Sequence, residues 1–357
     1  MFGAKSKLSN GDLLFIAFIT LLVLIAAFVF HQPVIAMWFG FAVAGYSAVS
    51  NDSIQTLGTF ISSNRKVKWY WLWLFLGGIL IATLVSGWYQ NIGDISYGRL
   101  SKIPHPEEFS FIQLLAPIVL LVITKLKMPV STTFLLLAVF SSSGTLGAMI
   151  NKTLIGYFVA FGVAAIFWGA FAYIVRNYIN KKYREKVRKQ NIGLWRFLQW
   201  CATAFLWYTW LSHDIANAAV FMPRTLDTNQ LVAVVAFLVL ALGFILYKKG
   251  GPIQTIIEEK TDIIHVKSAT LIDFVYGVVL VYFKEINDLP MSTTWVFLGL
   301  LAGRELALTQ LSGHEEPYKN TLTLVMKDLF RAGLGLIISV GLAAIANPEI
   351  LGIFKGI

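Results

Sequence analysis

The chain has 357 residues, of which 57% are hydrophobic and 13% charged, and its net charge is +10. A water-soluble fold does not bury so large an apolar fraction, and a mean hydropathy of +0.69 goes with apolar runs of about 20 residues, the length that crosses a bilayer. The basic residues stand between these runs, as the positive-inside rule predicts, which argues against nucleic-acid binding. The single cysteine, Cys201, excludes intrachain disulfides, redox pairs and cysteine zinc clusters.

The first apolar run, residues 12–30, follows Lys5 and Lys7 and could be a signal peptide. It is longer than the apolar part of a usual signal, and no small-residue cleavage motif follows it, so we interpret it as a retained span. A second run stops at the polar string 50–56, which predicts a break in the second helix. A third span, residues 67–89, carries Trp and Tyr at both ends as interfacial anchors.

A short apolar arm at residues 112–123 comes next and meets the string Pro129-Val130-Ser131-Thr132-Thr133. A second arm resumes to about Leu146. Two short arms joined at a proline and three hydroxyls predict a re-entrant hairpin, because broken backbone is tolerated at membrane depth only where it lines a cavity. A full span at residues 153–175 and a basic linker at 176–196 follow.

The same pattern then starts again. A span from about Leu198 is interrupted at Ser212-His213-Asp214-Ile215-Ala216-Asn217-Ala218. The later elements are, in chain order, a span at 231–247, an arm at 271–282, the string Pro290-Met291-Ser292-Thr293-Thr294, an arm to Leu301 and a span at 321–346.

The two halves form an internal repeat. Asp52 and Ser131 are 79 positions apart, and Asp214 and Ser292 are 78 apart, a match that unrelated segments rarely show. If the basic linker is cytoplasmic, the N-terminus is cytoplasmic too, and the second repeat enters the membrane in the opposite sense. The predicted fold is therefore an all-α polytopic membrane protein with two inverted repeats, each with a broken motif-bearing helix and a re-entrant hairpin. The predicted boundaries are 1–150 for the first repeat, 151–320 for the second, and 321–357 for a C-terminal span and tail.

The two hydroxyl triplets are candidates for an anion site. Each follows a proline at an expected helix start, where free N–H groups and the positive end of the helix dipole favour an anion. Brought together from opposite faces of the membrane, the two triplets would surround a small oxyanion with hydrogen-bond donors. Because they supply no fixed cation, the bound anion could also be released. Simple helix capping is the alternative, and duplication argues against it. The predicted anion-binding residues are Ser131, Thr132, Thr133, Ser292, Thr293, Thr294, Gln55 and Asn217.

Carboxylates inside apolar segments predict a cation site beside the anion. Alone, Asp52 and Asp214 would repel an anion, whereas a bound cation or proton cancels that repulsion, which is the physical basis of symport. Their oxygen-rich neighbours suit a hard ion such as Na⁺. Pairing with Lys or Arg is the structural alternative. The predicted cation-binding residues are Asn51, Asp52, His213, Asp214 and Asp273, with Na⁺ at Asn51, Asp52, Asp214 and Asn217.

Four motifs together carry a resemblance. They are Asn51-Asp52-x-x-Gln55-Thr56-x-Gly58-Thr59, His213-Asp214-Ile215-Ala216-Asn217-Ala218 and the two proline-hydroxyl strings. Their order and spacing, over residues 44–301, resemble the inorganic phosphate transporter (PiT) family. The resemblance implies cation-driven uptake of inorganic phosphate, with relatives that carry sulfate. The chain departs from the family pattern at Gln55, His213, Phe134 and Trp295, which leaves the anion and the coupling ion open.

The leading hypothesis is a Na⁺-coupled phosphate symporter of the cell (inner) membrane that works by alternating access. A proton-coupled carrier and a sulfate or other oxyanion permease are alternatives of the same fold; phosphate keeps a proton that a carboxylate accepts, which favours phosphate. An enzyme is not expected, because no G-x-S-x-G or H-E-x-x-H motif occurs. An anion channel would favour Lys or Arg at its constriction, whereas the charged residues inside these spans are acidic, which argues against a channel. The expected partners are the oxyanion, Na⁺ or H⁺ and the lipid bilayer, with no cofactor beyond the transported ions; a homodimer stays open.

Overall fold

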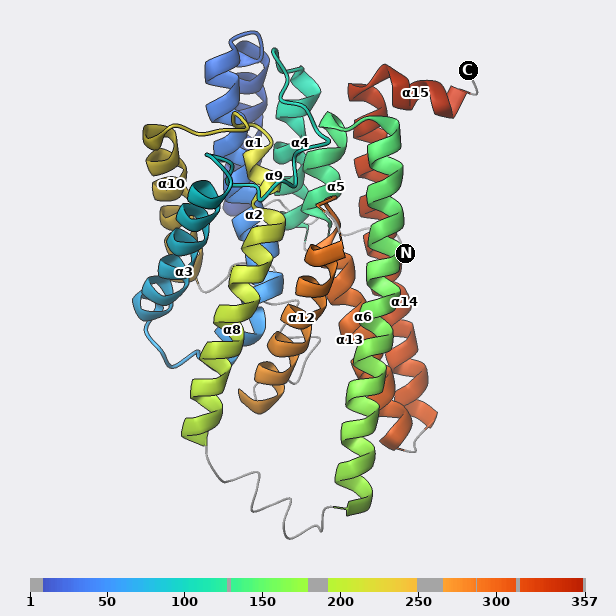
Figure 1. Cartoon of the computed structure of the whole chain (residues 1–357). Coiled ribbons are helices and arrows are strands. Elements are labelled where there is room, and N and C mark those ends of the chain that lie inside the picture. The colour runs from blue at the N-terminus through green and yellow to red at the C-terminus, as the bar shows by residue number, and fades with distance from the viewer. Residues whose placement is uncertain are drawn as a thin grey trace.

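The computed structural model describes residues 9–126, 130–178, 192–248, 266–286, 288–312 and 315–355, and every regular element in these ranges is a helix (Figure 1). Seven of the described helices are long and apolar enough to cross a membrane. Large apolar side chains such as Phe28, Ile166 and Phe330 are exposed on the outer wall, as lipid-facing residues are. The chain is an integral membrane protein, and the predicted all-α polytopic class is confirmed.

The helices follow the same order in both halves: a motif-bearing helix, a second helix, and then a pair of helices joined at a hydroxyl triplet. The first half contains α1 (Asn10–Val29), α2 (Pro33–Ser63), α3 (Trp69–Gln90), α4 (Phe111–Lys125), α5 (Thr132–Leu137) and the 3-10 turn η1 (Ala138–Phe140). The second half contains α6 (Ser143–Tyr178), α8 (Ile192–Asp214), α9 (Ala216–Ala219), α10 (Thr228–Tyr247), α12 (Val266–Ile286) and α13 (Thr293–Ser312), and α14 (Glu315–Ala346) and α15 (Pro348–Lys355) follow it.

The first motif helix is continuous, so the predicted break in it is wrong. α2 runs from Pro33 to Ser63 through the polar string 50–56, which contains no proline or glycine. Hydroxyls in and before the string bond back to their own helix: Ser47 Oγ donates to the Val43 carbonyl at 2.6 Å, and Ser50 Oγ to the Ser47 carbonyl at 3.0 Å. Such bonds satisfy polar side chains without opening the backbone ladder.

The second motif helix is interrupted, as the sequence predicts. α8 ends at Asp214 and the short helix α9 begins at Ala216, with a turn at Ile215 between them. This interruption leaves Asp214 at a helix end and Asn217 in the next turn.

The helix pairs α4–α5 and α12–α13 approach each other near mid-height. In Figure 1, α4 and α5 lie in the upper half of the molecule, and α12 and α13 lie in the lower half. The second arm of the first pair ends at Phe140 rather than near Leu146, because Ser142 Oγ accepts from the Thr145 N–H and starts α6 early. Both helices of the second pair extend beyond their predicted arms.

Two glycines bring α13 against the backbone of α6. A Cβ added at Gly299 or Gly303 would overlap the carbonyl oxygen of Tyr157 or Phe161, respectively. The spacing is the small-xxx-small pattern by which membrane helices approach closely. Helix α6 is thereby held along the helix that begins at the second hydroxyl triplet.

Gly303→Ala is expected to lower the stability of the folded protein by roughly 1–3 kcal/mol, because the new methyl group must push two backbones apart. The matched control is Gly162→Ala, since a Cβ there meets open space on the same helix pair. Melting temperatures in detergent measure both. Equal melting temperatures for the two variants would contradict the close packing.

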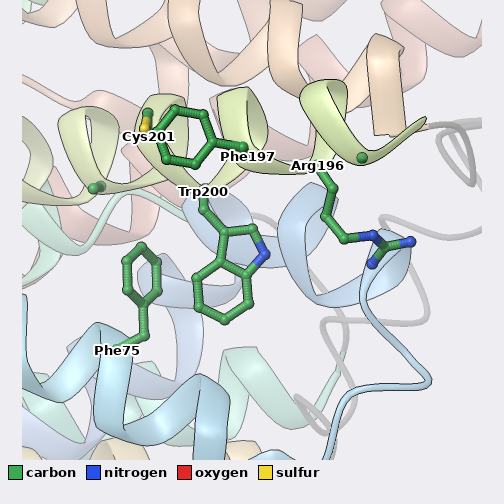
Figure 2. A pocket seen from close by; sticks show the side chains of 7 residues that line it. Phe75, Arg196, Phe197, Trp200 and Cys201 are labelled. Atoms are coloured by element: carbon green, nitrogen blue, oxygen red, sulfur yellow. The ribbon is translucent and has the colours of Figure 1, made fainter. Parts of the chain in front are cut away.

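The outer wall contains a shallow apolar hollow between α3 and α8, with a volume of about 430 Å³. Figure 2 shows Phe75 of α3 facing Trp200 of α8, with their ring centroids 4.5 Å apart. Arg196 extends away from these rings, and its guanidinium donates to Asn64 Oδ1 at 3.0 Å. The hollow suits lipid chains, and its lining offers no cluster of polar groups for an inorganic ion.

Candidate functional site

The ends of the two helix pairs, which we call the first tip (130–133) and the second tip (289–294), contact each other reciprocally. Thr133 Oγ1 in the first tip lies 3.4 Å from the Met291 carbonyl in the second. Thr294 Oγ1 lies 3.5 Å from the Val130 carbonyl. Equivalent threonines thus reach equivalent carbonyls across the junction, as a two-fold relation between the halves would produce.

The break between α8 and α9 supplies a polar cluster to this junction. Thr133 Oγ1 donates to Asp214 Oδ1 at 3.1 Å, and Asn217 Nδ2 donates to the same oxygen at 3.0 Å. Asn217 Nδ2 also lies 3.0 Å from Thr132 Oγ1. Thr293, in the second tip, is also buried at this junction. The structure therefore brings together residues predicted for both ions.

Two oxygens of this cluster can accept further hydrogen bonds or bind an ion. Asp214 Oδ2 and Asn217 Oδ1 are buried and have no hydrogen-bond partner among the described residues. Buried polar oxygens without partners are costly, and they occur where an ion or water completes the site. The side chains of the cluster are at most 4% exposed, so the site is closed to solvent in this conformation.

The serines of the triplets cap helices. Ser131 Oγ accepts from the Phe134 N–H at 3.1 Å, and Ser292 Oγ accepts from the Trp295 N–H at 3.3 Å. The expectation that both triplets open helices thus agrees with the structure. Accepting as a cap uses only a lone pair of each serine oxygen, so the serine O–H can still donate to a bound anion, whereas the hydroxyl hydrogen of Thr133 already points to Asp214.

The first motif contributes Asn51, whose Nδ2 donates to the Val130 carbonyl at 3.1 Å. This bond connects α2 to the first tip. The side chains of Asp52 and Gln55 lie outside the described part of the structure, as do Pro129 and most of the linker predicted at 176–196. Their assignments stay predictions.

His213 and Asp273 are buried but engaged elsewhere. His213 Nε2 lies 2.8 Å from the Leu280 carbonyl, so this nitrogen carries a proton and turns toward α12. Asp273 accepts from Thr59 Oγ1 and Thr203 Oγ1, both at 2.6 Å. Thr203 precedes Asp214 by roughly 16 Å of helix, so Asp273 forms a separate polar contact among α2, α8 and α12.

Within the described residues, no three His, Cys, Asp or Glu side chains cluster as transition-metal ligands do. The oxygens at the junction, from one carboxylate, one amide and several hydroxyls, instead suit a hard monovalent cation. The threonine hydroxyls and the amide also provide donors for an oxyanion.

Sequence reasoning missed several contributors to this site. The backbone carbonyls of Val130 and Met291 have no sequence signal of their own. Thr59 and Thr203, the partners of Asp273 outside this junction, look like ordinary polar residues of a membrane helix. Lys152 donates from Nζ to the Leu289 carbonyl of the second tip at 2.8 Å, and its sequence signal is a lone cation before an apolar stretch.

Comparison with known proteins adds one structural neighbour. No family model and no curated protein matches the sequence. A solved structure described as the sodium-dependent phosphate transporter matches with a TM-score of 0.59 at 14% identity, over 91% of this chain and 99% of that one. The two proteins share a fold. The match agrees with the all-α polytopic fold expected from the sequence, and at this identity it concerns the fold alone.

Proposed function

We propose that this protein is a secondary transporter that carries inorganic phosphate across a membrane together with Na⁺. The observation that carries the proposal is the closed junction of the two tips, where threonine hydroxyls, Asn217 and the Asp214 carboxylate converge. The fold shared with a sodium-dependent phosphate transporter supports the same assignment. The role is transport rather than catalysis.

The two ligands would bind with opposite electrostatic demands. The hydroxyls and the Asn217 amide donate to phosphate oxygens, while Asp214 repels the anion unless a cation neutralises it. Na⁺ beside Asp214 Oδ2 and Asn217 Oδ1 supplies that neutralisation, with Asn51 and Asp52 as the counterpart ligands from the first motif. Each ion therefore favours the other, which is what coupled transport requires.

The two halves are proposed to be inverted repeats that rock about this junction in alternating access. The reciprocal tip contacts and the opposite approach of the two helix pairs support this arrangement. The boundaries at 150 and 320, the cytoplasmic N-terminus and linker, and the location in the inner membrane belong to the same proposal. A homodimer stays a prediction.

Calorimetry of the purified protein tests the assignment. We expect phosphate to bind more tightly in Na⁺ than in choline, and Na⁺ to bind more tightly in phosphate, by the same factor. Sulfate is the competing oxyanion. Tighter binding of sulfate than of phosphate would assign the protein to the sulfate permeases, and binding that depends on pH but not on Na⁺ would make the driving ion a proton.

Thr133→Val is expected to weaken phosphate binding by roughly 1–3 kcal/mol, because a donor to a charged oxygen is lost. The Thr132→Ala, Thr293→Ala and Thr294→Val variants should act in the same direction. Ser110→Ala is the matched comparison: it removes the serine cap of α4 outside the junction, costs about 1 kcal/mol of stability and leaves affinity nearly unchanged. Calorimetry and melting temperatures separate the two effects. If all the threonine variants bind phosphate as tightly as the parent protein does, the triplets serve only as helix caps.

A further inference from the structure

The hollow between α3 and α8 combines an apolar lining with a basic side chain at one end. Phe75, Phe197, Trp200 and Ala204 supply apolar surface, and Arg196 lies at the end of the row (Figure 2). The lining residues of α8 from Arg196 to Ala204 extend over about 12 Å of helix. Phe197 is 65% exposed, so the hollow is open to the surrounding membrane. An elongated apolar groove of this kind suits a hydrocarbon chain.

The guanidinium of Arg196 uses only part of its hydrogen-bonding capacity. Its Nη1 donates to Asn64 Oδ1 at 3.0 Å, and the side chain is half-buried. Within the described ranges it makes no ion pair and no other side-chain hydrogen bond. Its partner is therefore neutral, and its charge is not compensated there. The unused edge, Nε and Nη2, is the one that binds two oxygens of a phosphate group side by side.

Arg196 is the outer member of a polar network that joins α2 to α8. Asn64, which follows the last residue of α2, is 1% exposed. Its Nδ2 donates to Gln199 Oε1 at 3.1 Å, and Gln199 Nε2 donates to Ser63 Oγ. A ligand on the unused edge of Arg196 would therefore also contact the junction between the two motif-bearing helices.

The surroundings of this end of the hollow are basic. Arg65, Lys66 and Lys68 follow Asn64 in the connection to α3, and all three are exposed. Neither residues 53–93 nor residues 186–213, which include the whole lining of the hollow, contain Asp or Glu. The local charge therefore favours an anion.

The same end lies at the level expected for lipid headgroups. Trp69 and Trp71, at the start of α3, are exposed, as aromatic residues at a membrane–water interface are. Helices α3 and α8 both begin at this end of the molecule (Figure 1). The positive ends of both helix dipoles therefore point to the same region as the basic side chains, and an anion there offsets both.

We propose that the hollow binds an anionic phospholipid, with the lipid phosphate on the unused edge of Arg196 and an acyl chain along the groove. The proposal goes beyond transport and does not depend on which ions the protein carries. Basic sites between membrane helices at the headgroup level are suited to anionic lipids. A zwitterionic lipid also has a phosphate, but its ammonium group meets the same basic residues, so it binds more weakly.

The bound lipid has a structural consequence. A phosphate on Nε and Nη2 leaves Nη1 free to keep its bond to Asn64, so both partners hold the guanidinium in one orientation. The lipid then stabilises the contact between the end of α2 and the start of α8. An anionic phospholipid should therefore raise the melting temperature of the protein more than a zwitterionic one does.

Native mass spectrometry of the purified protein, titrated with phosphatidylglycerol or phosphatidylcholine, measures the affinity for the first lipid bound. The parent protein should prefer phosphatidylglycerol. Arg196→Gln should lower that preference about fivefold or more, the factor that one basic side chain contributes at an anionic lipid surface. Lys319→Gln is the matched control and should keep the parent's preference. It removes an exposed cation near the start of α14, at the same end of the molecule but on the opposite side from α3 (Figure 1).

Cys201→Trp tests the groove separately from the headgroup. Cys201 is exposed, lines the hollow and lies about one and a half helical turns from Arg196. A tryptophan there should fill the space of the acyl chain and weaken both lipids about fourfold or more, the loss expected when one CH₂ group is no longer buried. The preference between the two headgroups should stay as in the parent. Millimolar inorganic phosphate should not displace phosphatidylglycerol, because it has no chain.

Equal affinity of the parent for the two lipids would overturn the proposal, as would the parent's preference in folded Arg196→Gln. If Arg196→Gln does not fold, Arg196→Lys, which lacks the two-nitrogen edge, and Cys201→Trp decide. Parent affinity for phosphatidylglycerol in both would overturn the site, and weaker binding in both supports it. Displacement by inorganic phosphate would instead assign Arg196 to a free anion. A lipid-free dimer that Cys201→Trp dissociates would assign the hollow to a second copy of the chain, and either result contradicts the proposal.

Discussion

Asp214→Asn is expected to abolish the coupling between Na⁺ and phosphate. The Asp214 carboxylate lies in the closed junction, accepts from Thr133 and Asn217 on one oxygen, and has a second buried oxygen with no partner among the described residues. Coupling between ligands in proteins is commonly about 5–150-fold. In the asparagine variant the factor should fall close to one, because a neutral amide neither repels the anion nor needs a cation.

Calorimetry of each ligand with and without the other measures this factor. Asp227→Asn is the matched control: it removes one carboxylate from an exposed cap, and asparagine caps a helix equally well. A folded Asp214→Asn protein with the parent's full coupling factor would move the cation site to another group.

Asp273→Asn is expected to change the Na⁺ dependence of transport and to lower stability. Asp273 is fully buried, and its two oxygens accept from Thr59 of α2 and Thr203 of α8. Hydrogen bonds to a charged group contribute roughly 1.5–3 kcal/mol, so losing one should lower the melting temperature. If the carboxylate also holds a cation, the Hill coefficient for Na⁺ should fall as well.

Thr203→Val separates these two roles, because it removes one hydrogen bond and leaves the carboxylate in place. Uptake at a series of Na⁺ concentrations gives the Hill coefficient, and thermal melting gives the stability. A lower Hill coefficient in Asp273→Asn alone supports a cation site. The same loss of stability in both variants, with unchanged Na⁺ dependence, would leave Asp273 as a link between the two motif-bearing helices.

The spacing of the motifs indicated that the two hydroxyl triplets lie close together, and the two tips are in contact. Apolar length fixes where helices form, and the repeated interval between a carboxylate motif and a hydroxyl triplet indicated that two equivalent tips exist. The contacts of Thr133, Asp214 and Asn217 agree with that expectation. The duplication of the hydroxyl triplet is informative because helix capping alone does not require two triplets at equivalent positions.

Other features could not be read from the pattern. A polar string looks the same whether its hydroxyls bond back to the helix, as Ser50 does, or break it, as happens near Asp214. The neighbours of Asp273 and Lys152 come from distant parts of the chain, so no local signal identifies them. The Gly303 contact with α6 likewise depends on tertiary packing.

Uptake of labelled phosphate by proteoliposomes tests the central claim most directly. An inward Na⁺ gradient should drive phosphate above its equilibrium level, a choline gradient should not, and Asp214→Asn should lose the difference. Labelled sulfate should accumulate less. Equal phosphate uptake with and without the Na⁺ gradient, in vesicles whose protein is folded and inserted, would contradict Na⁺-coupled phosphate transport.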